Sequence, residues 1–282
     1  MDLTRIYNMG CLEGMKEIPD GSIDAIICDL PYEVLHKNNP NAQWDRIIPF
    51  EPLWAQYERV IKDNGAILLF CQGMFTAKLM LSNEKLWRYN LVWDKCRVTG
   101  FLNANRMPMR CHEDIAVFYK SLPTYNPQYE DGPLNHSRGS GPHKQTNNCY
   151  GAHLNLSDPP KKDFGRDYEG RTYDSVKRVE ATVPDGKKLP RSIIAIQREH
   201  ESTVLHPTQK PVELLRYFIR TFTNPGEVIL DNCMGSGTTA IAAVMEKRKF
   251  IGFETDKTYY EKANARLKAL TGPFYIYGNI GV

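Results

Sequence analysis

Short apolar runs and longer amphipathic stretches follow one another along most of the chain. The apolar runs IDAIICDL, GAILLF, NLVWDK, DIAVFYK, EVILDN and KFIGFE have the length and composition of strands. The stretches EPLWAQYERVIK, KPVELLRYFIRTF and TTAIAAVMEK, which lie outside these runs, can form helices. Strands that are nearly continuous in apolar residues are typical of a parallel sheet covered on both faces. The pattern therefore predicts an α/β fold.

This rhythm is interrupted over residues 121–204. The stretch YNPQYEDGPLNHSRGSGPHKQTNNCYG is rich in Gly, Pro, Asn, His and Ser, and KRVEATVPDGKKLPRSIIAIQREH is rich in Lys and Arg. We predict an insertion here, between residues 1–120 and 205–282, which together form the α/β domain. Its composition suits a solvated, disordered segment. It equally suits phosphate contacts through Lys and Arg, with bases stacked on Tyr125, Tyr129, Tyr150, Tyr168 and Tyr173.

Composition narrows the class of protein. The 282 residues are 41% hydrophobic and 24% charged, as in an ordinary globular protein, and the net charge of +3 permits a nucleic-acid partner without requiring one. No apolar run reaches the roughly 20 residues of a membrane-spanning helix, and MDLTRIYNMG does not read as a signal peptide, so no membrane association is expected. The seven scattered cysteines favour a reducing cytoplasm over a disulfide framework. Because Cys and His never combine at zinc-ligand spacing, no metal is expected.

A glycine-rich turn lies in EVILDNCMGSGTTAIAA, residues 227–243. The strand ends on Asp231, Gly235 and Gly237 allow close approach of a ligand, and a helix can begin at Thr238. About 20 residues later the next strand ends on Glu254, whose carboxylate can accept both hydroxyls of a ribose. The segment therefore predicts a ribose-bearing cofactor. A P-loop is excluded, because no Lys follows the glycines in GxxxxGK[ST] order.

The second informative stretch is DLPY, residues 29–32, which closes the apolar run Asp24–Cys28. Together, DLPY and DNCMGSGTT resemble the amino-methyltransferases that use S-adenosylmethionine to methylate an exocyclic amine of a DNA base. The catalytic tetrapeptide precedes the cofactor glycines, with the variable segment between them, which is similar to the permuted β group of this family. The segments HPTQKPVELLRYFI and KFIGFETDKTYYEKANARL match the family in the same order. The resemblance implies a Rossmann-like sheet, S-adenosylmethionine as cofactor, and a target-recognition region at 121–204.

The resemblance also assigns catalytic roles to Asp29, Leu30, Pro31 and Tyr32. The Asp29 side chain and the Leu30 main-chain carbonyl would take the two amine hydrogens, Pro31 would stiffen the loop, and Tyr32 would stack on the extruded base. Leu30 is a departure, because the family usually has proline there, and leucine does not fix φ. The simpler interpretation is a strand end that turns through proline while Tyr32 packs.

The cofactor residues follow from the same comparison. Asp231 would lie near the methionine ammonium, residues 233–237 would wrap the methionine and ribose, and Glu254 would take the ribose hydroxyls. Alternatives are open for a few positions: Asp256 can cap the next helix, Lys210 can begin a solvated helix face, and Asn8 and Cys11 can be a polar turn and a buried thiol. The implied cofactor set is Asn8, Cys11, Asp29, His206, Thr208, Lys210, Pro211, Asp231, Asn232, Cys233, Met234, Gly235, Ser236, Gly237, Thr238, Glu254, Thr255 and Asp256.

The loop EVLHKNNPNAQWDRIIPF after Tyr32 resembles a mobile segment over the target pocket, with Trp44 and Asp45 its most distinctive residues, although Trp44 can equally be a core anchor. Within the family, Asp at position 29 favours adenine N6 over cytosine N4. The resemblance implies double-stranded DNA as substrate and a bacterial or phage-infected cytoplasm, and leaves open a homodimer and a cognate restriction endonuclease.

Rival functions are an inactive nucleic-acid-binding protein and a nucleotide-cofactor oxidoreductase. The oxidoreductase fingerprint is met only in relaxed form, because Ala240 stands at its sixth position. RNA and a protein glutamine amide are more remote substrates, since the related enzymes that act on them usually carry Asn in place of Asp29.

Overall fold

The computed structural model describes residues 1–33, 45–131, 184, 186–199, 205–206 and 208–272. The chain divides into two compact units, one made of Met1–Gln128 and Arg191–Val282 and the other of Tyr129–Pro190. The larger unit carries every element discussed below except β6 (Glu130–Asp131) and β7 (Lys187–Lys188). These two strands pair antiparallel in the smaller unit, where Lys188 forms an ion pair with Glu130 at 3.0 Å.

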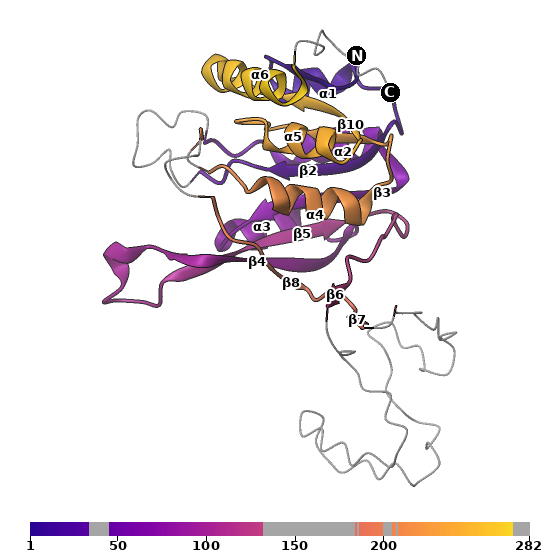
Figure 1. Ribbon diagram of the computed structural model, residues 1–282. Helices are drawn as coiled ribbons and strands as arrows, with labels where there is room; N and C mark the ends of the chain where they lie inside the picture. Colours follow the sequence, from indigo (N-terminus) through magenta and orange to yellow (C-terminus); the bar gives the residue numbers. More distant parts are fainter. Residues whose placement is uncertain (34–44, 132–183, 185, 200–204, 207, 273–282) are drawn as a thin grey trace. The chain divides into compact units, whose positions relative to one another are not determined.

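The larger unit is built on an eight-stranded sheet with the order β1-β10-β9-β2-β3-β5-β4-β8 (Figure 1). The strands are β1 (Arg5–Tyr7), β2 (Ile23–Asp29), β3 (Ile61–Cys71), β4 (Trp87–Thr99), β5 (Arg110–Phe118), β8 (Ile193–Ala195), β9 (Val228–Asp231) and β10 (Lys249–Phe253). The helices are α1 (Cys11–Lys16), α2 (Phe50–Val60), α3 (Met74–Ser82), α4 (Val212–Phe222), α5 (Thr238–Met245) and α6 (Lys257–Thr271).

The sheet is mixed rather than fully parallel. Neighbours from β1 to β3 run parallel, but β5 is antiparallel to both β3 and β4. The prediction of a parallel sheet is therefore wrong at this end. The reason is the connection over residues 100–109, which is too short for the crossover of a dozen or more residues that parallel strands need. β4 and β5 form a long hairpin instead.

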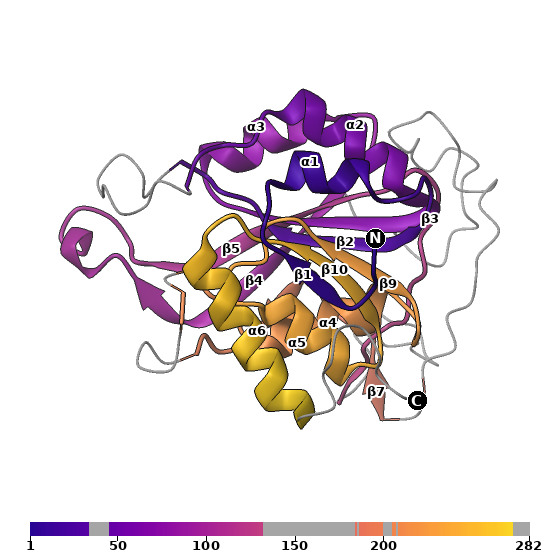
Figure 2. The same cartoon turned by 90° about the horizontal axis from the view of Figure 1, so that it is seen from above.

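Helices cover both faces of the sheet, as the apolar pattern predicts. α1, α2 and α3 lie on one face and α4, α5 and α6 on the other (Figure 2). Side chains of a strand alternate between faces, so Ala25 and Ile27 of β2 pack in the cluster under α4, whereas Ile26 and Cys28 pack in the cluster under α1 and α2. The resulting three-layer arrangement agrees with the Rossmann-like fold implied by the sequence.

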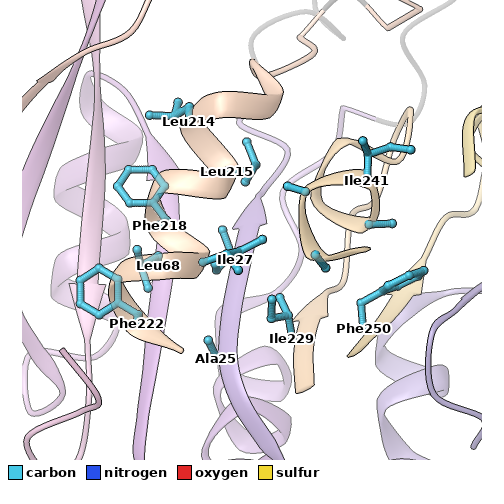
Figure 3. Packing of buried hydrophobic residues seen from close by; sticks show 14 of the residues in the cluster. Ala25, Ile27, Leu68, Leu214, Leu215, Phe218, Phe222, Ile229, Ile241 and Phe250 are labelled. Atoms are coloured by element: carbon cyan, nitrogen blue, oxygen red, sulfur yellow. The ribbon is translucent and has the colours of Figure 1, made fainter. Parts of the chain in front are cut away.

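Helix α4 shows how an amphipathic segment packs on the sheet. Its buried residues recur at helical spacing and form one apolar stripe; they include Leu214, Leu215 and Phe218. Figure 3 shows this stripe facing Ile27 and Leu68 of the sheet, with Phe250 on the opposite side of the cluster. The adjacent helix α5 is rich in Ala and Thr and is buried over most of its length. Small side chains let it pack closely against α4, α6 and strand β10.

The smaller unit, Tyr129–Pro190, lies inside the insertion that the sequence predicts at residues 121–204. Asn126 belongs with the larger unit, because its backbone N–H donates to Thr221 O at 2.7 Å and its side-chain amide donates to Arg220 O and Thr223 O. At the other end, β8 pairs parallel with β4. A three-residue strand such as β8 leaves too short a pattern to detect in a polar segment. The helices α1 and α3 and the strand β8 were not predicted from the sequence.

Within the described residues, no helix is long and apolar enough to cross a membrane. The same part of the chain contains no cluster of three or more His, Cys, Asp or Glu side chains suited to a metal ion.

Candidate active site

Acidic side chains follow the carboxyl ends of adjacent parallel strands. Asp29 ends β2, Asp231 ends β9, and Glu254 follows β10. Since β2, β9 and β10 are neighbours in the sheet, these ends meet at one edge. The chain leaves β2 toward β3 and leaves β9 toward β10, so this edge is a switch point of the topology, where α/β proteins commonly bind ligands. A cavity of about 750 Å³ lies here.

Most of the predicted site residues line this one cavity. They are Cys11, Asp29, Leu30, Pro31, Tyr32, His206, Thr208, Lys210, Asp231, Asn232, Cys233, Met234, Gly235, Ser236, Thr238, Glu254 and Thr255. The structure therefore brings the DLPY stretch and the glycine-rich turn to one cavity, although about 200 positions separate them in the chain.

The other predicted residues, Asn8, Pro211, Gly237 and Asp256, do not belong to the cavity wall. The Asn8 side-chain amide donates to the carbonyls of Glu254 and Thr255 at 2.8 and 3.2 Å, so it fixes the loop after β10. Asp256 caps α6 by accepting the N–H groups of Thr258 and Tyr259, which is the simpler of its two interpretations. Gly237 (φ 82°) lies against α6, where an added Cβ would come 2.8 Å from the Ala263 Cβ.

The Asp29 carboxylate is held on both oxygens. Oδ1 accepts the Tyr32 hydroxyl at 2.7 Å, and Oδ2 accepts the Lys210 ammonium at 2.5 Å. The side chain is 21% exposed and faces the cavity. Burial raises the pKa of Asp29, and the positive charge of Lys210 opposes that rise. Each carboxylate oxygen has a second lone pair, so the group can still accept hydrogen bonds from a ligand.

Lys210 belongs to a buried row of alternating charges. Its ammonium lies 3.3 Å from Glu113 of β5, and Glu113 in turn pairs with Lys95 of β4 at 2.6 Å. Burial would lower the pKa of Lys210, but Asp29 and Glu113 outweigh it and raise that pKa. Burial would likewise raise the pKa of Glu113, yet Lys210 and Lys95 lower it. In the row Lys95, Glu113, Lys210 and Asp29, each acidic side chain therefore lies beside a basic one, which is the arrangement that buried ionisable groups require.

Glu113 and Lys95 were not predicted as site residues. Both line the cavity, and both lie in the polar parts of their strands, Lys95 next to Asp94 and Glu113 between His112 and Asp114. Their polar neighbours in the sequence hide them, so nothing local marks these two residues as buried. Lys210 was predicted, but for the cofactor side; the structure places its ammonium on the proposed catalytic carboxylate.

The loop after β2 is fixed by contacts on either side. Leu30 is 4% exposed and packs in the cluster under α1 and α2, so packing holds this position where the family has a proline ring. The Tyr32 ring lies 4.8 Å from the Phe75 ring. Asp45, which is 3% exposed, accepts the N–H groups of Tyr32 and Glu33 at 2.9 and 3.0 Å. Trp44, the other distinctive residue that the sequence analysis gives for this loop, lies outside the described residues.

The glycine-rich turn carries two carboxylates. Glu254 accepts the Gly235 N–H at 2.7 Å on one oxygen and the Asp256 N–H at 2.8 Å on the other. Asp231 accepts the Thr239 hydroxyl at 2.5 Å and the Cys233 N–H at 3.0 Å. Burial raises the pKa of Asp231 to about 6 and also raises the pKa of Glu254. Raised carboxylate pKa values in a cavity favour a cationic or hydroxyl-bearing ligand, which would stabilise the ionised form.

The loop that precedes α4 is tied to this turn. Gln209 accepts the Ser236 hydroxyl at 2.8 Å, and the Arg266 guanidinium donates to the Ser236 carbonyl at 2.7 Å. His206 lies 4.2 Å, ring to ring, from Tyr259. Burial, together with the Lys210 charge, lowers the pKa of His206 to about 4, so this imidazole is neutral near pH 7. Gln209 and Arg266 are further residues that the sequence did not single out.

The fold and site define a Rossmann-like methyltransferase. Residues 23–265 match the family model described as DNA methylase, and the chain belongs to this family of N6/N4 DNA methyltransferases. Its cofactor is S-adenosylmethionine.

Curated relatives and solved structures agree with this assignment. The type II methyltransferase M1.MboII of Moraxella bovis is 24% identical, over 96% of this chain and 98% of the relative. M.BglII of Bacillus subtilis is 27% identical, over 93% and 68%. The crystal structure of the M1.HpyAVI–SAM complex has a TM-score of 0.56 at 20% identity, covering 93% of this chain and 98% of that one. The PvuII DNA methyltransferase, titled cytosine-N4-specific, has a TM-score of 0.59 at 15% identity, covering 93% and 85%.

The residues around the cavity suit S-adenosylmethionine. The cavity volume of about 750 Å³ lies within the ~300–1,000 Å³ range of small-molecule sites. A Cβ added at Gly10, which lines the cavity, would meet no atom within 4 Å, so the wall is open there. Asp231 and Glu254 are the carboxylates available for an ammonium group and a ribose diol. The chemistry of this donor set therefore fits the cofactor.

Proposed function

We propose that the protein is a site-specific DNA methyltransferase that acts on the N6 amine of adenine in a flipped-out base. The observation that carries this proposal is the Asp29 carboxylate, which faces the shared cavity at the end of β2 and is oriented by Tyr32 and Lys210. Within the family that the sequence resembles, an acidic residue at this position is associated mostly with adenine.

The chemistry needs a redirected lone pair. The amine of adenine is a poor nucleophile, because its lone pair is delocalised into the ring. In this proposal, Asp29 and the main-chain carbonyl of Leu30 accept the two amine hydrogens, which turns the lone pair out of conjugation. Tyr32 offers an aromatic face for the extruded base, a contact worth about 1–3 kcal/mol. The proposal thus gives each residue of DLPY except Pro31 a direct contact with the base.

Bound S-adenosylmethionine supplies a methyl group on a positively charged sulfur. On receiving the methyl group, the amine nitrogen would gain positive charge and would then release a proton to the Asp29 carboxylate or to water. A fixed carboxylate at Asp29 stabilises that charge more in the transition state than in the ground state. Asp231 and Glu254 bind and orient the cofactor through its ammonium group and ribose hydroxyls.

Cytosine N4 is the second candidate base, because the amine chemistry is the same. The cytosine-N4-specific neighbour shares the fold at 15% identity, so the fold alone does not separate the two bases.

The proposal extends to double-stranded DNA as the substrate in a bacterial or phage-infected cytoplasm, and to residues 121–204 as the target-recognition region. A cognate restriction endonuclease is a further expected partner, and the type II methyltransferases among the relatives support it. A homodimer completes the expected partners.

Identification of the methylated nucleoside tests which base the enzyme methylates. Unmethylated genomic DNA is incubated with S-adenosylmethionine labelled in the methyl group, digested to nucleosides and analysed by mass spectrometry. We expect labelled N6-methyladenine, and no label with the Asp29→Ala variant. Labelled N4-methylcytosine would keep the mechanism and overturn the choice of base. If no label is transferred although S-adenosylmethionine binds, the proposal of DNA methylation is contradicted in favour of an RNA substrate or an inactive binding protein.

A further inference from the structure

The β4–β5 hairpin reaches beyond the other strands of the sheet in both ribbon views (Figures 1 and 2). Its tip is an ordered turn, because the N–H groups of Asn103 and Ala104 donate to the carbonyls of Gly100 and Phe101 at 2.9 and 3.0 Å. Phe101 and Asn103 bound a short 3-10 helix. The tip therefore presents its side chains in a defined way.

These side chains are unusually apolar for a surface. Phe101 is 81% exposed and Leu102 is 96% exposed, next to each other at the end of the hairpin. Further exposed apolar residues lie on the same hairpin; they are Val98, Met107 and Met109. Single exposed apolar residues are ordinary, but a group of them on one projection marks an interaction surface.

The charge of the hairpin indicates the partner. Residues 96–112 contain Arg97, Arg106 and Arg110 and no Asp or Glu. A basic surface with a central pair of large apolar side chains suits nucleic acid, where arginines contact phosphates and an apolar wedge enters the base stack.

The position of the hairpin relative to the cavity also supports nucleic acid as its partner. Trp93, Lys95 and Thr99 of β4, and Arg110 and Glu113 of β5, line the cavity that Asp29 faces. Thr99 pairs with Arg110 at the last rung of the hairpin, immediately before the tip. Phe101 and Leu102 thus follow the cavity-lining Thr99 within three positions, within reach of a duplex whose target base enters the cavity.

We propose that Phe101 and Leu102 form a wedge that enters the DNA base stack next to the target base and holds it open while that base occupies the cavity. This inference rests on the proposed DNA methylation. Extrusion of a base costs unstacking and unpairing energy, least for a base that is already mispaired. A wedge that fills the vacated space offsets part of that cost, so its benefit should be confined to a paired target.

The test compares two duplex oligonucleotides. Both carry the methylation site, located first by sequencing DNA that the enzyme has methylated, but in one of them the target base is mispaired. The double variant F101Q/L102Q is compared with the parent enzyme and with L81Q, because Leu81 is also 68% exposed but lies on α3. We expect F101Q/L102Q to lose about tenfold or more in kcat/KM on the paired duplex and less than about twofold on the mispaired one. The L81Q variant should match the parent on both.

Each other outcome has a separate meaning. An equal loss on both duplexes would overturn the wedge, because a general defect in folding or DNA binding does not depend on pairing. Parental activity of F101Q/L102Q on the paired duplex would also overturn it. A change in oligomeric state of F101Q/L102Q, measured by light scattering, would assign the tip to a second copy of the chain instead. Absence of methylation by the parent enzyme on any DNA would contradict the proposed function rather than the wedge.

Discussion

The Lys210 ammonium lies 2.5 Å from Oδ2 of Asp29, although 181 positions separate these residues in the chain. Lys210 comes from the loop before α4 and Asp29 from the end of β2, so the contact joins the two halves of the cavity. Glu113 lies 3.3 Å from the same ammonium. This relationship makes the ionisation of Asp29 depend on a residue that the proposed chemistry does not otherwise use.

The first prediction concerns the pH dependence of methyl transfer in Lys210→Met. Burial raises the pKa of Asp29 and the Lys210 charge opposes that rise, so removal of the charge should raise the pKa further. The reaction needs the ionised carboxylate, and the acid limb of the kcat/KM profile should therefore move to higher pH. Lys210→Arg keeps the charge and should move the limb much less. An unchanged acid limb in Lys210→Met would show that Asp29 does not set the profile.

The second prediction separates the two halves of the cavity. Asp29→Ala should abolish methyl transfer while the Kd for S-adenosylmethionine stays nearly unchanged, because Glu254 and Asp231 lie at the ends of other strands. Glu254→Gln should weaken cofactor binding, measured by calorimetry, and should lower kcat less at saturating cofactor. If Asp29→Ala kept activity, Asp29 would have no part in the mechanism. If Glu254→Gln bound the cofactor normally, the ribose assignment would be wrong.

The sequence predicts the carboxylates at strand ends because that signal is local. Asp29, Asp231 and Glu254 each follow an apolar run, and parallel strands bring such ends together at one edge. The direction of β5 was not predicted correctly, since an apolar strand looks the same in either orientation and only the short connection over residues 100–109 decides it.

Contacts between distant residues could not be read from the sequence. Glu113 and Lys95 enter the site only because β5 pairs with β3 and β4 pairs with β5. Lys210 reaches Asp29 only when α4 packs on the sheet. Gly237 has a structural requirement that its motif did not indicate. The sequence predicts that this glycine lets the backbone approach the cofactor, and in the structure the missing side chain also makes room for Ala263 of α6.

The third prediction is that cofactor binding depends on pH through Asp231. Its pKa is raised to about 6 in the folded protein, above the ordinary value of 3.8. Between about pH 4 and 6 the folded protein therefore holds a proton that the unfolded chain releases, and this group alone makes the free energy of unfolding fall as pH rises. A cofactor ammonium favours the ionised form, so the Kd for S-adenosylmethionine should rise toward tenfold per unit as pH falls below about 6.

Calorimetry at several pH values measures this dependence. The Asp231→Asn side chain cannot titrate. The Kd of this variant for S-adenosylmethionine should therefore be higher than that of the parent near neutral pH and should change less between about pH 5 and 7. The same slope in both proteins would assign the titration to another group, with Glu254 the first candidate because burial also raises its pKa.

The fourth prediction concerns Gly237→Ala. The residue has φ 82°, and an added Cβ would come 2.8 Å from the Ala263 Cβ. The left-handed conformation costs about 1–2 kcal/mol for a residue with a side chain, and the close contact adds to it. The free energy of unfolding should fall by more than in Gly226→Ala, where φ is 87° and nothing lies within 4 Å of the added atom. Equal losses in urea unfolding would show that α6 shifts freely.

The last prediction tests the loop that carries Leu30 and Tyr32. Asp45 accepts the N–H groups of Tyr32 and Glu33 and is almost fully buried, so Asp45→Ala leaves two backbone donors without this partner. An unsatisfied buried donor costs about 1–3 kcal/mol, and the loop should relax to avoid that cost. We expect kcat to fall while the Kd for S-adenosylmethionine changes little, because the cofactor carboxylates lie at the ends of β9 and β10. Asp45→Asn retains an acceptor oxygen and should keep most of the activity. If Asp45→Asn lost as much kcat as Asp45→Ala, the carboxylate charge rather than the two hydrogen bonds would be what the loop requires.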